Sequence, residues 1–207
     1  YFLGDVVAEV YGYRMAKQLI WASFAAIFIF DMLPALLIKL PAPAFWHYQT
    51  SYDNVIGTLP RTFTADFIAL NAGAFVNAYL ISKWKVLANG RFFCLRSLCS
   101  TGIGEAVFNA IAFTIVFANS LSWRLIFQAM IFSYIFKAFF AIIGVFPAYM
   151  LSQLLKSKEG IDIYDYNINY NPFKPSKLVN KQEDLKPQPP RISPFDQEKK
   201  SSKVENL

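Results

Sequence analysis

The stretch "IFQAMIFSYIFKAFFAIIGVFPAYMLSQLL", residues 126–155, decides the class of fold. Its only charged side chain is Lys137, near the middle. A run this long and apolar can span a bilayer, whose hydrocarbon core requires about 20 such residues. A lysine at that depth costs about 2.5–3.5 kcal/mol unless a partner or a wet cavity offsets the cost. The stretch therefore predicts a membrane helix and makes Lys137 a candidate functional residue.

The rest of the chain has the same apolar character. Of its 207 residues, 55% are hydrophobic, 17% are aromatic and 16% are charged. Residues 19–40, 62–82, 100–121 and 125–155 are each long enough to cross a membrane, and the opening residues 1–13 read as the end of a fifth span. We therefore expect an all-α polytopic membrane helix bundle over residues 1–155. Because the chain opens inside an apolar stretch, we also expect residues upstream of Tyr1.

The loops between these spans differ in their basic residues. Three loops are rich in lysine and arginine, and the two alternate loops carry one arginine each, Arg61 and Arg124. Basic loops of membrane proteins stay on the cytoplasmic side. The basic loops, with the C-terminus among them, are therefore predicted to be cytoplasmic. They contain Arg14 and Lys17, then Lys83, Lys85, Arg91 and Arg96, then Lys156 and Lys158.

Residues 156–207 have a different composition from the bundle. Six of the eleven prolines fall in the final 36 residues, in runs such as "KPQPPRISPFDQEKKSSKVENL". Such a segment buries too little apolar surface to offset the entropy lost on ordering, which predicts a mostly disordered cytoplasmic tail. One part, "IDIYDYNINYNPF" at residues 161–173, is aromatic enough to fold back on the cytoplasmic face of the bundle.

Several classes of function find no support in the composition. The net charge of +6 is spread along the chain, so we expect no direct contact with nucleic acid. The sequence contains two cysteines, Cys94 and Cys99, and one histidine, His47, which are too few for a four-ligand metal site. It also offers no nucleophile paired with a base for catalysis. We therefore expect no metal, no cofactor and no enzymatic activity.

Polar residues recur at helical spacing inside the predicted spans. Residues three, four or seven positions apart lie on one face of a helix, and three spans each carry such a polar face. One explanation is helix packing, in which small and amide side chains hold helices together and Lys137 pairs with Glu105. The other is a binding site for a polar planar ligand, to which carboxylate and amide groups are suited. Its candidate residues are Asn77, Thr101, Glu105, Asn109, Tyr134 and Lys137.

A second group of charged residues is a candidate for ion coupling or gating. Asp5 and Glu9 lie four positions apart, and like charges at this spacing repel. Either both carboxylates point to cytoplasmic water, or one is protonated or paired with a cation. Asp31 is a further intramembrane carboxylate, close to Pro34. Arg61 is the fourth candidate for ion coupling or gating.

The chain resembles the queuosine precursor transporters, also called the vitamin-uptake-transporter-like family. The resemblance covers residues 3–174 and rests on ordered motifs, among them "GDVVAEVYGYRMAK", "PAPAFWHYQTSYDNVIG", "FVNAYLISKWKVL", "RFFCLRSLCSTGIGEAVFNAIAF", "YIFKAFF" and "KEGIDIYDYNINYNPF". It implies a six-helix importer in the bacterial inner membrane, of which about five spans are visible here. The implied substrate is a 7-deazaguanine, such as 7-cyano-7-deazaguanine, salvaged for tRNA modification.

Two positions depart from the pattern of that family. Ala74 stands where relatives often have an acidic residue, and Phe108-Asn109 stands where they often have Asp-Thr. The carboxylate of this span is instead Glu105, one turn earlier. If the family's aspartate holds the guanine-like edge, either Glu105 replaces it or the ligand differs.

Three alternatives therefore remain at this point. The chain is a carrier of a small purine-like molecule, a carrier of another small heterocyclic nutrient, or a membrane scaffold that transports nothing. All of them place it in a lipid bilayer, and all are compatible with a homo-oligomer.

Overall fold

The structure is a computed structural model that describes residues 1–37, 39–41, 45–57, 59–166 and 168–174. The regular secondary structure of these residues is helical: α1 (Phe2–Leu37), α2 (Gln49–Ile56), α3 (Leu59–Leu87), α4 (Phe93–Phe117) and α5 (Trp123–Glu159). Four stretches are long and apolar enough to cross a membrane: Phe2–Pro34, Gln49–Leu87, Phe93–Phe117 and Trp123–Glu159. The prediction of a polytopic membrane helix bundle is confirmed.

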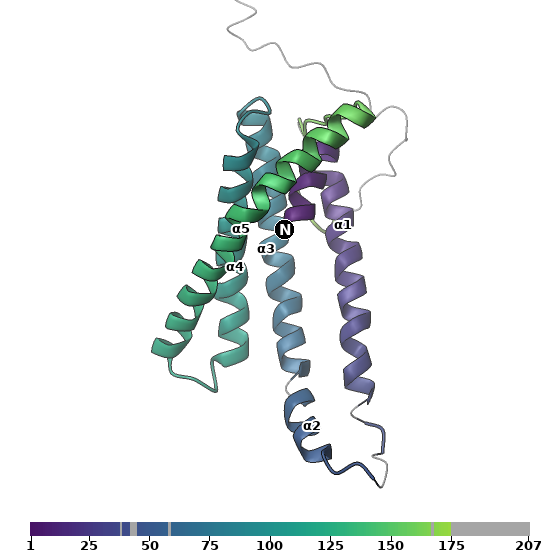
Figure 1. The fold of residues 1–207 in the computed structure, drawn as a ribbon, viewed down its shortest axis with the longest axis vertical. Coiled ribbons are helices and arrows are strands. Elements are labelled where there is room, and N and C mark those ends of the chain that lie inside the picture. Colours follow the sequence, from purple (N-terminus) through teal and green to yellow (C-terminus); the bar gives the residue numbers. More distant parts are fainter. Residues whose placement is uncertain (38, 42–44, 58, 167, 175–207) are drawn as a thin grey trace, which may run out of the picture.

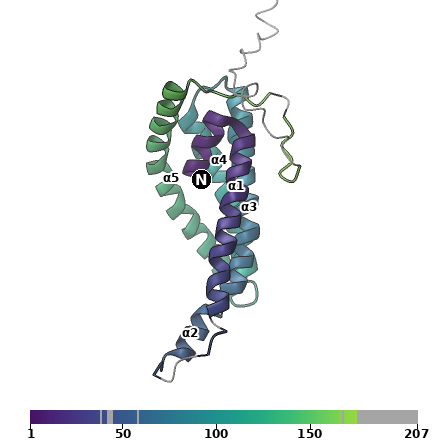
Figure 2. The same cartoon turned by 90° about the vertical axis from the view of Figure 1, so that its right-hand side faces the viewer.

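Helix α1 contains a sharp reversal at Gly12. This residue has φ 78° and ψ 177°, a backbone conformation that glycine adopts without steric cost. Residues 2–11, which we call the N-terminal arm, therefore turn back beside the longer part of α1 (Figure 2). The partial fifth span expected from the sequence falls on this arm and stays a prediction, since the first of the four candidate spans, Phe2–Pro34, includes these residues.

The N-terminal arm packs among the long helices, with α4 and α5 on one side of it and the longer part of α1 and α3 on the other. Helix α1 packs on α3 and α5, and α4 packs on the same two helices (Figure 1). Apolar arm residues such as Val6 and Val10 are fully buried, together with Ile81 of α3 and Ala148 of α5. This packing brings the polar side chains of the arm, Asp5 and Glu9 among them, against the neighbouring helices.

Helices α3 and α4 come into close backbone contact at two glycines. A Cβ atom built on Gly73 would lie 2.7 Å from the carbonyl oxygen of Gly104, and one on Gly104 would lie 2.8 Å from that of Gly73. Small residues permit this contact, as is common between membrane helices. The packing explanation of the small residues on these faces is thus correct at this crossing.

Residues 161–174, which we call the strap, fold back across one end of the bundle (Figure 2). The strap is held to α1 by hydrogen bonds from Ile163 N to the Val10 carbonyl (3.1 Å), from the Tyr13 hydroxyl to the Tyr170 carbonyl (2.7 Å) and from Trp21 Nε1 to the Pro172 carbonyl (3.2 Å). The expected return of this segment to the bundle is confirmed. Helix α5 ends at Glu159 rather than at the predicted boundary of 155, and the predicted disorder of residues 175–207 lies outside the described residues.

Candidate functional site

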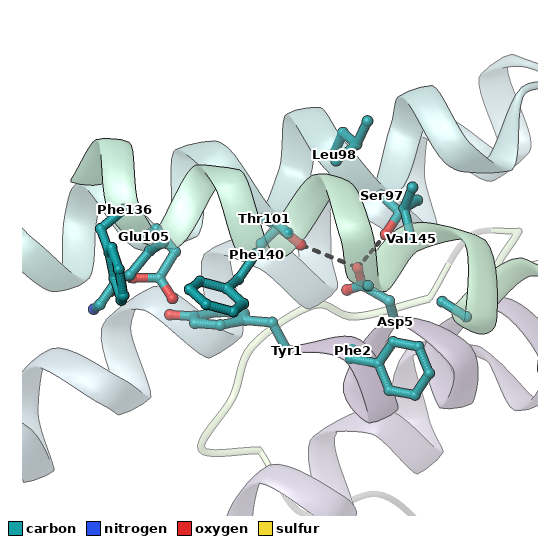
Figure 3. A pocket seen from close by; sticks show the side chains of 14 residues that line it. Tyr1, Phe2, Asp5, Ser97, Leu98, Thr101, Glu105, Phe136, Phe140 and Val145 are labelled. Atoms are coloured by element: carbon teal, nitrogen blue, oxygen red, sulfur yellow. Dashed lines mark hydrogen bonds and ion pairs between the residues drawn. The ribbon is translucent and has the colours of Figure 1, made fainter. Parts of the chain in front are cut away.

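Asp5 is a buried carboxylate in the middle of the bundle, only 1% exposed. It accepts hydrogen bonds from Asn77 Nδ2 of α3 (2.6 Å) and from two hydroxyls of α4, Thr101 Oγ1 (3.1 Å) and Ser97 Oγ. Figure 3 shows both hydroxyls pointing at the carboxylate. None of the ion pairs among the described residues involves Asp5. We call these four residues the Asp5 cluster.

Lys137 of α5 forms an ion pair with Glu105 of α4. Its Nζ lies 2.8 Å from Glu105 Oε2 and 3.3 Å from Asn109 Oδ1, and it stands 3.9 Å from the ring centroid of Phe108. The ion pair considered from the sequence is therefore present. The pair is not sealed, because the Lys137 side chain is 33% exposed and that of Glu105 is 15% exposed.

The Asp5 cluster and the ion pair open into one cavity between the N-terminal arm, α4 and α5. Its volume is about 290 Å³. Most of its lining is apolar. Asp5, Ser97, Thr101, Glu105 and Lys137 supply the polar part, which we call the polar wall. Apolar residues of α5, among them Phe136, Phe140 and Val145, line the cavity as well, and so does Tyr1 (Figure 3). The polar faces predicted for α4 and α5 therefore line a common hollow.

A second cavity lies on the other side of the N-terminal arm. It has a volume of about 300 Å³ and is lined by the arm, the longer part of α1 and α3. Asn77 lines this second cavity, while its amide nitrogen bonds Asp5, which lines the first. The Asp5 cluster therefore stands between two cavities.

Glu9, one turn further along the arm, has different surroundings. It is also 1% exposed, but its carboxylate pairs with Arg96 (3.0 Å) and Lys156 (2.7 Å). Lys85 donates to the backbone carbonyl of Glu9 and, within 2.6 Å, to Asp162 of the strap. The alternative in which both arm carboxylates point to water is wrong, and the alternative of a paired carboxylate is correct for Glu9.

The same contacts correct the sequence interpretation of two basic residues. Lys85 and Arg96 were expected to be loop charges, yet they are 1% and 5% exposed. Each reaches back from a helix end to the N-terminal arm. Arg96 neutralises the buried Glu9 carboxylate, whereas Lys85 bonds the Glu9 backbone carbonyl and pairs with Asp162. Their value as signals of membrane orientation is correspondingly smaller.

The strap closes over the reversal of α1 through Asp165. Its Oδ2 accepts hydrogen bonds from the backbone nitrogen of Tyr13 (2.7 Å) and from Ser82 Oγ. A Cβ atom on Gly12 would lie 2.8 Å from Asp165 Oδ1, so only glycine fits beside it. Burial raises the pKa of the Asp165 carboxyl above its ordinary value, and these two hydrogen bonds oppose the rise.

Three further predicted site residues lie away from the main cavity. Tyr134 lines a separate hollow with Gly102 and Ala106 on the outer side of α4 and α5, so its assignment to the binding site has no support in this geometry. Arg61 donates from Nε (3.0 Å) and Nη2 (2.8 Å) to the Ile115 carbonyl, and so joins the start of α3 to the end of α4. The side chain of Asp31 lies outside the described residues.

Sequence reasoning missed several residues of the site. Ser97 is one turn before Thr101, so extending the polar face of α4 by four positions would have found it. Arg96 and Lys156 could not be assigned to Glu9, because nothing local in the sequence joins positions so far apart. Tyr1 contributes a buried hydroxyl that has no partner among the described residues.

The described residues contain no group of three or more histidine, cysteine, aspartate or glutamate side chains that could hold a metal ion. The polar groups at the cavity are instead the Asp5 carboxylate, which has hydrogen bonds but no cation partner among the described residues, one ion pair, and hydroxyl and amide groups. Such groups can exchange hydrogen bonds with an uncharged polar molecule.

Comparison with known proteins gives two findings. A family model described as "Putative vitamin uptake transporter" matches residues 1–152. A protein of Bacillus subtilis (strain 168), described as "Probable queuosine precursor transporter", is 24% identical over 165 residues, which cover 77% of this chain and 70% of that protein. No solved structure matches the chain.

Proposed function

This chain belongs to the putative vitamin uptake transporter family, and we propose that it imports a queuosine precursor across the bacterial inner membrane. The substrate we propose is a 7-deazaguanine such as 7-cyano-7-deazaguanine, used in salvage for tRNA modification. The description of the Bacillus subtilis relative supports this choice of substrate class. The basic loops and the C-terminus would face the cytoplasm.

The observation that carries the proposal is the polar wall of the cavity of about 290 Å³. An ion pair and a free carboxylate, buried in a membrane bundle, share one hollow there. Ionisable groups are costly at such depth, and they are typical of substrate and ion pathways. The cavity volume is close to the lower end of the range of small-molecule pockets, about 300–1,000 Å³. A bicyclic heterocycle is a suitable occupant.

The groups of the cavity match the edges of a guanine-like ring. The Glu105 carboxylate can accept two N–H bonds from the amidine-like edge, and Lys137 can donate to a ring carbonyl. Phe136 and Phe140 offer flat apolar surfaces to the ring faces. Thr101 adds to the polar wall one turn before Glu105. Asn109 does not line the cavity and acts on it only through Lys137, whose Nζ donates to Asn109 Oδ1 at 3.3 Å. We assign substrate recognition to these α4 and α5 residues, with Asn77 reaching them through Asp5.

Uptake measurements test this proposal. Cells that lack de novo queuosine synthesis are given labelled 7-cyano-7-deazaguanine, with and without this gene, and uptake and tRNA queuosine are measured. We expect uptake only with the gene. If no 7-deazaguanine is taken up while the protein is present in the membrane, the proposed substrate class is wrong.

The variant Lys137→Met separates a transporter from a membrane scaffold. A transporter should still reach the membrane and lose at least about tenfold in uptake, which is about 1.4 kcal/mol of lost interaction. A scaffold whose ion pair only joins helices would show no uptake to lose. Lys158→Met, the same change at the exposed end of α5, is the control and should transport normally. Normal uptake by Lys137→Met would remove Lys137 from the site.

A further inference from the structure

The Asp5 cluster has the composition of a site for a small cation. Oxygen atoms from two elements converge there: both carboxylate oxygens of Asp5 on the arm and the hydroxyls of Ser97 and Thr101 on α4. The Asn77 amide of α3 adjoins them through its Nδ2, which donates to Asp5. Hard cations bind carboxylate, hydroxyl and carbonyl oxygens. We propose that the Asp5 cluster binds a sodium ion.

The charge balance of the bundle favours a monovalent cation. Glu9 is neutralised by Arg96 and Lys156, and Glu105 by Lys137. Asp5 has no such partner among the described residues, and its neutral donors leave one negative charge uncompensated. An isolated charge in a low-dielectric interior is costly. One positive charge would neutralise the Asp5 cluster, whereas a divalent ion would leave it with a net positive charge.

Asn77 supplies a second, independent observation. Its side chain is 3% exposed, its Nδ2 donates to Asp5, and its Oδ1 is buried without a hydrogen-bond partner among the described residues. Buried amide oxygens are rarely left without a donor or a cation. Rotation of this amide would bring Oδ1 to the carboxylate side, where it could coordinate the ion. Sodium binding thus explains the orphaned oxygen as well as the uncompensated charge.

An ion can reach this position from the cavities described above. Asp5, Ser97 and Thr101 line the cavity that contains Glu105 and Lys137, and Asn77 lines the cavity behind the arm. The ion would bridge the N-terminal arm to α3 and α4, so its binding should hold these three elements together. A role in driving uptake rests on the proposed function, but binding of the ion itself does not.

Thermal melting of the purified full chain in detergent, without any deazaguanine, tests the site. Melting temperatures are compared in sodium chloride and in choline chloride at equal ionic strength. A tenfold excess of sodium over its Kd should raise the melting temperature by about 3–6 °C. The rise should vanish in Asp5→Asn and shrink in Ser97→Ala.

Ser100→Ala is the matched control. It is the same change one turn away on the same helix, and Ser100 Oγ bonds the Ser97 carbonyl rather than Asp5. It should keep the full sodium response, and the Ser97 and Ser100 pair still decides the matter if Asp5→Asn fails to fold. A sodium response that survives in Ser97→Ala and Asp5→Asn would overturn the site. So would a wild-type melting temperature that responds to acid but not to sodium, which would indicate a proton instead. Neither outcome bears on uptake, so failure of the ion site and failure of the proposed function are distinguishable.

Discussion

Asp5 and Glu9 lie one turn apart on the same arm and are equally buried, yet their surroundings differ completely. Two cations and the nearby strap surround Glu9, whereas neutral hydroxyls and an amide surround Asp5. A buried charge with full compensation fixes a structure in place. A buried charge without compensation, beside a cavity, is available for another partner. We infer that the Glu9 end of the arm is an anchor and that the Asp5 end is the working surface.

The largest effect on stability is expected from Glu9→Gln. The change leaves Arg96 and Lys156 buried without their carboxylate, and breaking a buried ion pair in this way costs about 3–5 kcal/mol. Melting in detergent should show a strongly lowered transition or no folded protein. Glu159→Gln, at the exposed end of α5, is the control and should melt like the wild type. A Glu9→Gln protein of normal stability would remove the distinction between the Glu9 end and the Asp5 end of the arm.

A smaller loss is expected from Gly12→Ala, which affects the anchored end without changing a charge. Alanine at φ 78° is strained, and its Cβ would meet Asp165 Oδ1 at 2.8 Å, so the cost should be about 1–3 kcal/mol. Gly4→Ala on the same arm has open space around the new Cβ and should be neutral or stabilising by about 0.5–1 kcal/mol. Equal melting temperatures for the two variants would mean that the reversal at Gly12 does not depend on glycine.

Asp5→Asn should show the opposite behaviour to Glu9→Gln. It removes an uncompensated charge at nearly constant shape, so the free energy of unfolding should change by less than about 1 kcal/mol. Uptake of labelled 7-cyano-7-deazaguanine should nevertheless fall at least about tenfold. If Asp5→Asn unfolds like Glu9→Gln, Asp5 is an anchor as well.

The smallest effect is a pH dependence at the strap. Burial raises the pKa of Asp165 above its ordinary value of 3.8, so the folded state binds this proton more tightly than the unfolded state. The contribution of this group to strap docking is therefore fully present below about pH 3.8 and is lost as the pH rises through the raised pKa. The protection of the backbone amides of residues 161–174 against hydrogen exchange, relative to their intrinsic rates at each pH, should decrease over that range. Asp165→Asn should abolish this decrease. Protection that increases with rising pH would contradict this assignment.

Much of this arrangement could be predicted from the sequence because it depends on local spacing. Hydropathy located the four spans, and the four-residue steps Thr101, Glu105 and Asn109 placed one polar face on α4. The pairing of Lys137 with Glu105 belonged to one of the two explanations left open for the polar faces, and the structure contains it. The aromatic residues of the strap likewise indicated that it would find apolar surface.

The parts that escaped prediction depend on contacts between distant segments. Gly12 reverses the chain through its positive φ, and Asp165, far along the sequence, leaves no space there for a Cβ. Arg96 and Lys156 resembled loop charges until the arm placed Glu9 between them. Tyr134 has the right helical spacing to Lys137, but it faces Gly102 on the outer side of α4 rather than the cavity. Spacing defines a face and does not say which neighbour covers it.

Equilibrium binding of labelled 7-cyano-7-deazaguanine to the purified protein tests most directly whether the cavity is a substrate site. The wild type should bind saturably, Glu105→Gln should bind at least about tenfold more weakly, and the exposed control Glu159→Gln should bind like the wild type. Equal binding by Glu105→Gln and the wild type, or no binding by a folded wild type, would contradict the assignment of this cavity to the substrate.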